Sequence, residues 1–351
     1  MQPLPIPQPG GSIEALRRFL NVRDGRDFVL AVAWALAVLR NRGPYPVLVL
    51  SGEQGSAKST FARILRSLLD PKLAPLRALP REDRDLFIAA TNSHMLVFDN
   101  ISDLRGWISD ALCRLATGGG FATRKLHTDQ DEVLFDACRP VILNGIEDIV
   151  TRPDLADRAI FLTLKAIPEE ERQAEDELWT DFEAEQPKIL GALLDAMAHG
   201  LKRLPEIRLD NLPRMADFAK WATACETAFW DAGTFEAAYA GNRDDAVDSV
   251  LEGDPVASAI RSMMNERDDW EGTATELLAP FDEEVGEKVR NTKSWPSTAR
   301  ALSGRLRRAA PFLRKSGIEI TFEREAKTRI IRMTQKPTDD AHFVTDDAPN
   351  P

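Results

Sequence analysis

Four short apolar runs in the first half of the chain have the length and composition of buried β-strands. They are VLVL at residues 47 to 50, MLVF at 95 to 98, PVIL at 140 to 143 and AIFLTL at 159 to 164. Helical patterns separate them, and continuous apolar strands that alternate with helices indicate a parallel sheet covered on both faces. Residues 27 to 167 are therefore predicted to form an α/β core.

The longest apolar run, FVLAVAWALAVL at residues 28 to 39, predicts a buried helix. It is shorter than the roughly 20 residues that a helix needs to cross a bilayer. The Pro-rich residues 1 to 11 are expected to be mobile, and they lack the basic and apolar segments of a secretory signal. Residues 1 to 26 are thus predicted to form an N-terminal extension with a first helix, and no membrane contact is expected.

After residue 167 the pattern changes to helix formers with a dense acidic run, PEEERQAEDELWTDFEAEQ. Such a run is usually a solvated helical face, so no chemistry is assigned to it. Residues 168 to 253 are predicted to form a helical lid, with breaks at Pro213, Gly233 and Gly241. Three helical patterns and two strands, IEITF and RIIRM, then predict a winged helix-turn-helix over residues 254 to 334, before a disordered tail over 335 to 351.

Composition is that of an ordinary folded protein. Hydrophobic residues make up 43% and charged residues 29%, which excludes a disordered or fibrous chain. Cys113, Cys138 and Cys225 show no CxxC spacing, so neither a disulfide framework nor a zinc site is predicted, and a cytoplasmic location is expected. The net charge is −11, yet residues 296 to 336 carry eleven Lys and Arg against three Glu, a net of +8. This asymmetry points to an anionic partner at the C-terminal end.

The strongest motif is VLVLSGEQGSAKSTFARIL, an apolar strand followed by a loop of small residues and a helix. Such a loop can turn its backbone N–H groups inward around phosphate oxygens, and the helix N-terminus adds partial positive charge. Lys58 would reach the β- and γ-phosphates of ATP, and Ser59 would offer its hydroxyl to Mg²⁺. The predicted nucleotide contacts are Gly52, Glu53, Gln54, Gly55, Ser56, Ala57, Lys58, Ser59 and Thr60.

This loop departs from the general pattern at Ala57, because a glycine usually stands directly before the lysine. A methyl group fits there if the residue keeps a negative φ, although it narrows the approach to the phosphates. An ordinary strand-to-helix turn with a chance match to the motif is the alternative interpretation.

A second motif, HMLVFDN, places Asp99 at the end of a strand. Its carboxylate would hold Mg²⁺ through water, whereas a surface Asp-Asn turn is the alternative. Asn100 follows, and its amide can orient an attacking water but cannot take its proton. Hydrolysis is therefore expected to be slow or to recruit another acid, such as Glu53 or Asp103.

Three further polar residues lie in later motifs. Asn144 ends the run PVILN and would touch both the γ-phosphate and the attacking water. Arg158, in TRPDLADRAIFLTL, would neutralise charge on a γ-phosphate of its own or a neighbouring subunit, or would pair internally with Asp154. Arg214, in NLPRMADFAKW, would clamp the nucleotide from a lid helix or would lie on the surface.

The order of these motifs resembles the ATPase part of phage and mobile-element primase-helicases, which are AAA+ ATPases related to superfamily 3 helicases. The segments that carry the resemblance are GEQGSAKST, VFDN, DALCRLATGGGFATRKLHTD, VILNG, RPDLADR and PRMADFA, and it covers roughly residues 16 to 333. It implies that Lys58 and Ser59 are phosphate-loop residues, Asp99 the Mg²⁺-holding acid, Asn144 the sensor, Arg158 the arginine finger and Arg214 a second sensor. Priming would then reside on a separate primase or initiator chain.

The resemblance also implies a hairpin, from Thr117 to Asp129, that projects into the central channel of a ring. The glycines at 118 to 120 permit a tight reversal of the chain. Cations near the tip would grip the phosphates of a single DNA strand, and these are Arg124, Lys125 and His127. A solvated basic loop is the alternative.

A basic helix is predicted from Ser297 onward, with apolar positions at Leu302, Leu306, Ala309 and Leu313 that would face the core. On the opposite face, phosphates of duplex DNA would meet three cations seven residues apart, which are Arg300, Arg307 and Arg314. Pro311 is expected to kink or restart the helix. A solvated helix that only packs on its neighbours would give the same pattern.

Together these features predict a P-loop ATPase that works as a homo-oligomeric, hexameric DNA helicase with ATP and Mg²⁺ as cofactors. It would hydrolyse ATP between subunits and pull single-stranded DNA through its pore during replication of a phage, plasmid or integrated element. Asn100 favours a second hypothesis, an ATP-switched DNA-binding loader or regulator with slow hydrolysis. A small-molecule kinase is the third, and the basic C-terminal region and Arg158 argue against it.

Overall fold

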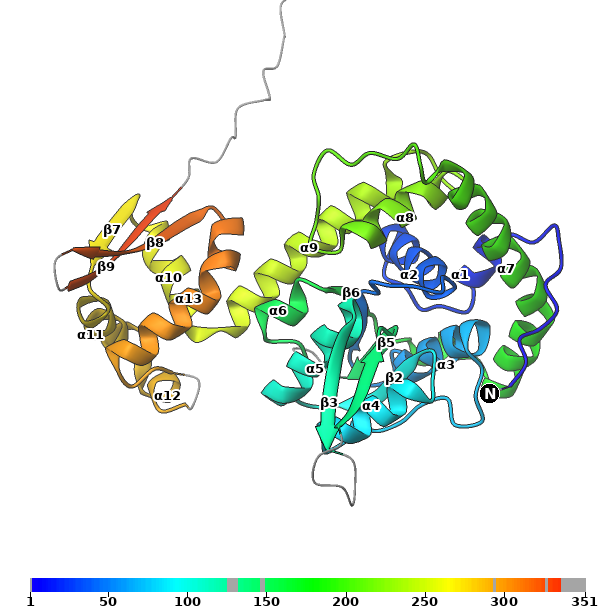
Figure 1. Cartoon of the computed structure of the whole chain (residues 1–351), viewed down its shortest axis with the longest axis horizontal. Helices are drawn as coiled ribbons and strands as arrows, with labels where there is room; N and C mark the ends of the chain where they lie inside the picture. Colours follow the sequence, from blue (N-terminus) through cyan, green and yellow to red (C-terminus); the bar gives the residue numbers. More distant parts are fainter. Residues whose placement is uncertain (1, 125–131, 146–148, 293–294, 326–327, 336–351) are drawn as a thin grey trace, which may run out of the picture. The chain divides into compact units, whose positions relative to one another are not determined.

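The computed structural model describes residues 2–124, 132–145, 149–292, 295–325 and 328–335. The chain divides into two compact units, Met1–Ala246 and Val247–Pro351. Figure 1 gives the element labels used below.

Four parallel strands form the sheet of the first unit. They are β1 (Val47–Gly52), β2 (Leu96–Ile101), β5 (Val141–Gly145) and β6 (Ala159–Leu164), in the order β2-β5-β1-β6. All four coincide with the apolar runs of the sequence, so the predicted parallel α/β sheet is confirmed. Because every strand runs in the same direction, the carboxyl ends of β1, β2 and β5 meet at one edge.

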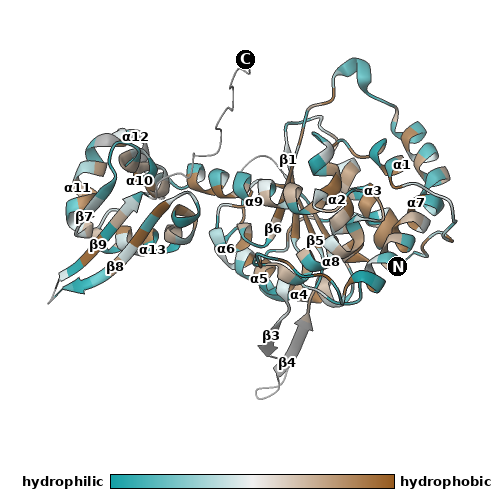
Figure 2. Cartoon of the chain, turned by 90° about the horizontal axis from the view of Figure 1, so that it is seen from above, coloured by the Kyte–Doolittle hydropathy of each residue, from teal (hydrophilic) through white to brown (hydrophobic). Residues whose placement is uncertain are grey.

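The run at residues 28 to 39 forms α2 (Gly25–Val38), which is buried along nearly its whole length as predicted. The indole nitrogen of Trp34 donates to the carbonyl of Pro46 at 2.7 Å and so ties α2 to the start of β1. Side chains of α2 and α3 (Lys58–Leu69) share one apolar core with alternate residues of the sheet. Figure 2 shows these apolar segments gathered inside the first unit. Two further helices precede and follow β2, α4 (Asp83–Thr91) and α5 (Gly106–Thr117).

The segment predicted as a lid contains three long helices, α7 (Glu175–Arg203), α8 (Ala216–Glu226) and α9 (Thr234–Gly253). Phe182 of α7 and Trp221 of α8 belong to the same core as α2 and the sheet. The Trp221 indole nitrogen donates to the Leu36 carbonyl at 3.1 Å, which fixes α8 on α2. These two helices are therefore built into the first unit.

The N-terminal segment is not mobile as expected, because it is hydrogen-bonded along the surface of the first unit. The amide of Gln2 donates to the Pro71 carbonyl, and that of Gln8 donates to the Pro187 carbonyl in α7, both at 2.9 Å. Gly191 makes this approach possible, since a Cβ there would lie 1.9 Å from the Gln8 carbonyl oxygen. The short α1 (Glu14–Arg17) follows and packs near α7.

The expected break at Gly241 does not occur, and the last helix does not restart at Pro311. Gly241 lies inside α9, and Pro311 lies inside the continuous α13 (Ala299–Lys315). A glycine costs a helix only about 1 kcal/mol, which packing can outweigh. In α9 that packing includes the buried Asn242, whose side chain accepts from the Phe161 amide at 3.0 Å and donates to the Phe161 carbonyl at 2.5 Å.

A hairpin lies between α5 and β5, formed by β3 (Gly119–Arg124) and β4 (Glu132–Ala137) in antiparallel register. It extends outward from the sheet of the first unit (Figure 1). A hairpin was predicted here, and its second strand lies beyond the expected end at Asp129. The short α6 (Pro153–Ala156) precedes β6, and a 3₁₀ turn at Glu169–Glu171 precedes α7.

In the described part of the second unit, four helices that follow α9 accompany a three-stranded antiparallel sheet of order β7-β9-β8. Its helices are α10 (Pro255–Asn265), α11 (Ala274–Glu284), α12 (Gly286–Arg290) and α13, and its strands are β7 (Asp269–Gly272), β8 (Ile318–Glu325) and β9 (Thr328–Gln335). The hairpin β8–β9 contains both predicted strands. Sequence analysis missed β7, because its four residues, DWEG, carry no apolar alternation.

None of the helices in the described part of the chain is both long enough and apolar enough to span a bilayer.

Asp27 makes the first unit sensitive to pH. It lies buried in the first turn of α2, and one of its carboxylate oxygens has no hydrogen-bond partner. Burial raises the pKa of Asp27 from 3.8 to about 6, although the nearby Arg23 opposes the shift. Because the folded state then binds the proton of Asp27 more tightly than the unfolded state does, the contribution of Asp27 to stability is fully present below about pH 4 and is lost as the pH rises to 6.

Replacing Asp27 by Asn should therefore raise the free energy of unfolding at pH 7 by up to about 3 kcal/mol. Urea unfolding of both proteins from pH 4 to pH 7 measures this difference. The gap between variant and wild type should be small at pH 4 and widen up to pH 6. A gap that does not change with pH would contradict the assignment.

Candidate active site

The loop between β1 and α3, residues 53 to 57, has a backbone that depends on its two glycines. Gly52 and Gly55 have φ values of 141° and 84°, which side chains rarely adopt. A Cβ on Gly52 would also lie 2.3 Å from the Leu164 carbonyl oxygen in β6. The loop can therefore pass this close to β6 only with a glycine at position 52.

Three carbonyl groups near this loop accept hydrogen bonds from other groups of the chain. Those of Gly52 and Glu53 each accept from Lys58 Nζ at 2.7 Å, and that of Gly55 accepts from the Ile167 amide at 3.2 Å. The first-turn amides of α3 gain no side-chain cap, because the residue before the helix is Ala57. Amide donors that lack a partner at a helix N-terminus attract anions. The first turn of α3 thus offers amide donors without a side-chain cap.

Asn21 holds the loop from outside. Its side-chain amide donates to the Ser56 carbonyl at 2.9 Å and to the Lys165 carbonyl, beyond β6, at 2.7 Å. It thereby fixes the loop against the end of a neighbouring strand. Sequence analysis did not identify Asn21, because a contact across 35 residues leaves no local pattern.

Lys58 is the first residue of α3, and its side-chain ammonium group lies among the atoms of the loop. Besides the two carbonyls, its Nζ lies 3.1 Å from Ser56 Oγ, and Ser56 is completely buried. Burial lowers the pKa of Lys58 from its ordinary value, and the Asp99 carboxylate partly offsets that effect. The ammonium group is therefore already positioned among the loop atoms.

Three predicted residues from three different elements meet beside the loop. Ser59 Oγ, in the first turn of α3, donates to the two carboxylate oxygens of Asp99 at 3.0 and 3.2 Å. Asn144, buried at the end of β5, donates from Nδ2 to Ser59 Oγ at 3.1 Å and also to Asp99. Hydroxyl and carboxylate oxygens are the ligands that Mg²⁺ prefers, so this cluster fits the metal expected with a nucleotide.

A β-bulge in β2 accounts for the position of Asp99. The register with β5 shifts between Phe98 and Ile101, and Asn100 has a φ of 56°. Bulges re-aim side chains next to functional sites. Here the Asp99 side chain points toward Ser59 and Asn144, whereas the Asn100 side chain is exposed.

The condition under which a methyl group would fit at position 57, a negative φ, is not met. Ala57 has φ 58° and ψ 28°, the left-handed conformation. The turn into α3 needs this conformation, which the usual glycine adopts without strain. The backbone of Ala57 is therefore sterically strained at the start of the helix.

Replacing Ala57 by Gly should raise the free energy of unfolding by about 1 kcal/mol, because the left-handed strain of about 1–2 kcal/mol exceeds the roughly 0.5 kcal/mol of added chain entropy. Urea unfolding measures the change. Ala89→Gly, inside α4, is the control and should lower stability by about 1 kcal/mol. Equal losses in both variants would show that position 57 is not strained.

Several predicted site residues lie apart from this cluster. Arg158 is 11% exposed and donates to the Asp154 carbonyl at 2.5 Å, which is the internal pairing considered above. Arg214 is exposed just before α8, and no hydrogen bond or ion pair of the described residues links it to the loop. The side chains of Glu53 and Gln54 are exposed, and Thr60 follows Ser59 in α3.

One further cation near the loop was missed. Arg172 comes so close to Gly55 that a Cβ there would lie 3.5 Å from its Nη2. This arginine belongs to the acidic run to which no chemistry was assigned. Sequence analysis passed over Arg172 because most charged residues around it in the sequence are acidic.

The predicted DNA contacts are spread over both units. Arg124 ends β3, and Lys125 and His127 lie outside the described residues. Arg300 and Arg307 are exposed on α13. Arg314, on the same helix, lies 4.0 Å from Glu319 in β8, so a carboxylate partly compensates its charge.

Family models cover most of the chain. Residues 13–249 match the actinomycete integrative conjugative element replication protein. The chain belongs to this family. The family's C-terminal domain matches residues 256–346, so the replication-protein match continues through the second unit. The protein is therefore a replication protein of the kind that mobile conjugative elements carry.

Solved structures with similar folds are distant. The apo C-terminal region of NrS-1 is 14% identical with a TM-score of 0.45, over 95% of this chain and 79% of that one. The active helicase SCCmec type IV Cch is 13% identical with a TM-score of 0.47, over 92% of this chain and 69% of that one. No curated protein matches the chain.

Proposed function

We propose that this replication protein is an ATP-dependent DNA motor, a helicase or translocase that hydrolyses ATP at subunit interfaces. The observation that carries the proposal is the convergence of Lys58, Ser59, Asp99 and Asn144 at one edge of the sheet. Membership of a mobile-element replication family supports DNA as the partner.

In this proposal Ser59 and Asp99 hold Mg²⁺, and the loop amides with Lys58 bind the phosphates of ATP. The metal supplies charge neutralisation at the phosphate oxygens. Lys58 places a positive charge beside the γ-phosphate, and Asn144 orients the attacking water from the end of β5. Its amide cannot accept the water proton, which leaves the exposed Glu53 as the nearest acid in the loop.

Arg158 is proposed as the arginine finger of a neighbouring subunit in a homo-hexamer. Its internal contact with Asp154 would then break when the subunits assemble around ATP. The charge-assisted pair is partly solvated, with Asp154 79% exposed, so its loss costs little. Arg214 is the proposed second sensor, and it would approach the nucleotide by a movement of the segment before α8.

The second unit is proposed to be a winged-helix DNA-binding domain. Its helices α10, α11 and α13 and its hairpin β8–β9 match the parts of that fold. The hairpin β3–β4 is proposed to contact single-stranded DNA through Arg124, Lys125 and His127.

A second function, an ATP-switched loader or regulator, is favoured by two observations. Ala57 strains the phosphate loop, and Asn100 takes the position after Asp99 where a carboxylate could act as a base. Both features would slow turnover without preventing ATP binding.

Rates of ATP hydrolysis with and without single-stranded DNA, together with displacement of a forked duplex, separate these functions. A motor should show strong stimulation by DNA and should unwind the fork. ATP-dependent assembly on DNA without unwinding would support the switch. Failure to bind ATP at any Mg²⁺ concentration would overturn both.

Mixed subunits test the role of Arg158. Arg158→Ala and Asp99→Ala proteins should each be inactive alone, yet a mixture should regain part of the ATPase activity. Recovery is expected because a finger supplied by the neighbour restores an intact site at some interfaces. A mixture as inactive as its components would place Arg158 outside the neighbour's site, and Arg152→Ala serves as the matched control.

A further inference from the structure

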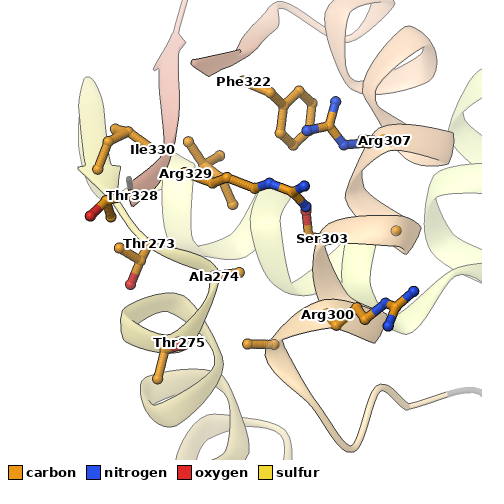
Figure 3. A pocket seen from close by; sticks show the side chains of 13 residues that line it. Thr273, Ala274, Thr275, Arg300, Ser303, Arg307, Phe322, Thr328, Arg329 and Ile330 are labelled. Carbon is orange, nitrogen blue, oxygen red and sulfur yellow. The ribbon is translucent and has the colours of Figure 1, made fainter. Parts of the chain in front are cut away.

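A cavity of about 710 Å³ lies in the second unit between α13, the start of α11 and the hairpin β8–β9. Its size falls within the range of small-molecule sites, and a nucleotide would fit inside. Figure 3 shows Arg307 beside Phe322 and Arg329 reaching across the cavity toward Ser303. The site therefore combines cations with an aromatic ring.

The charge of this cavity is uncompensated. Arg300, Arg307 and Arg329 line it, and no lining residue is acidic. None of the ion pairs among the described residues engages these three arginines. Arg332, also in β9, differs because it pairs with Glu271, Glu323 and Glu325. The cavity therefore carries three arginines without a carboxylate partner among the described residues.

Phe322 and Arg307 form a stacking surface. The Arg307 guanidinium lies 4.2 Å from the centre of the Phe322 ring, and Phe322 is half-buried. Unpaired bases stack on aromatic rings and on guanidinium planes, whereas the bases inside a duplex have no free face. A concave site with this surface therefore favours an unpaired nucleotide over a regular duplex.

The walls of the cavity also suit a phosphate backbone. Ser303 and Gly304 have small side chains and let a strand approach α13 closely. Thr273, Ala274 and Thr275, at the start of α11, line the opposite part and are small as well.

We infer that this cavity binds an unpaired nucleotide of a DNA strand. The base stacks against the Arg307–Phe322 pair, and Arg300 and Arg329 neutralise the flanking phosphates. This inference rests on the proposed function for the choice of DNA as the polymer. It makes the second unit a reader of single-stranded or locally opened DNA.

Fluorescence anisotropy of the full chain with labelled oligonucleotides tests the inference. The probes are a 12-nucleotide single strand, a duplex of the same sequence and that duplex with one unpaired nucleotide. Every protein carries Arg124→Ala and Lys125→Ala, so that the predicted hairpin site does not contribute. Binding is measured without ATP, and ATPase activity is measured separately, so failure of the ATP site would not affect the result.

Phe322→Leu keeps apolar volume but removes the ring. It should weaken binding of the single strand and of the duplex with an unpaired nucleotide about 5- to 150-fold, in line with about 1–3 kcal/mol per stacked base, and should change duplex binding less than twofold. Arg307→Lys keeps the charge, loses the planar group and should show the same selectivity. Arg308→Ala is the matched control, because Arg308 is exposed on the same helix but does not line the cavity.

Equal losses for all three probes in Phe322→Leu would overturn the inference and leave a general phosphate surface. Unchanged binding in both variants would overturn it as well. Thermal unfolding confirms that each variant is folded, and an RNA strand of the same sequence shows whether the sugar is read. Tighter binding of RNA than of DNA would contradict the assignment to DNA.

Discussion

Lys58→Ala is expected to lower ATP turnover by about 100- to 1,000-fold, the loss typical when one preorganised donor to a reacting group is removed. The substitution removes the charge beside the phosphates and also leaves the Gly52 and Glu53 carbonyls without their donor. Phosphate release under saturating ATP and Mg²⁺ measures the effect. Nucleotide binding should weaken in the same variant.

Lys72→Ala is the matched control for Lys58. Its ammonium group binds the Asn92 carbonyl and Ser93 Oγ, both at 2.7 Å, well outside the loop contacts described above. That variant should keep turnover within about twofold of wild type. If Lys58→Ala retained turnover at the level of this control, residues 52 to 60 would not form the ATP site.

Asp70→Ala should lower the free energy of unfolding by about 3–5 kcal/mol. Asp70 and Arg66 form an ion pair of 3.4 Å at the end of α3, and their side chains are only 1% and 2% exposed. Asp70 also accepts from the Met95 amide at 3.0 Å, and Arg66 donates to the Met95 carbonyl. Removing the Asp70 carboxylate leaves the buried Arg66 guanidinium without a negative charge to pair with.

Urea unfolding of four proteins measures this effect. The double variant Arg66→Met/Asp70→Leu should recover part of the lost stability, because it removes the unpaired buried charge, although the Met95 amide and carbonyl then lose their side-chain partners. Glu175→Ala breaks the exposed pair with Arg63 and should cost less than about 1 kcal/mol. If Asp70→Ala lost no more stability than Glu175→Ala, solvent would have to reach the Arg66–Asp70 pair.

The sheet and its central helix could be predicted because each strand is a continuous apolar run and α2 is apolar throughout. Lys58, Ser59, Asp99 and Asn144 could be found because each directly follows or begins such an element. Their mutual contacts then follow from parallel strands that end at one edge.

Residues whose roles depend on distant contacts could not be found in this way. Asn21 holds the loop across 35 residues, and Phe322 and Arg329 meet Arg307 only through the packing of β8–β9 on α13. The left-handed conformation of Ala57 could not be predicted, because the turn into α3 decides its φ and alanine itself does not favour it. Hydrogen bonds with Pro71 and Pro187 fix the N-terminal segment, and no local sequence pattern predicts them.

Both outer strands of the central sheet have their backbones engaged by the same chain. Asn242 occupies the amide and carbonyl of Phe161 in β6. At β2 the Arg77 amide donates to the Val97 carbonyl, and the Asp99 amide donates to the Arg77 carbonyl. A free strand edge invites another polypeptide to extend the sheet, and these positions offer none. Another polypeptide therefore cannot add a strand to the central sheet at these positions, and the sheet that holds Asp99 is closed there by its own chain.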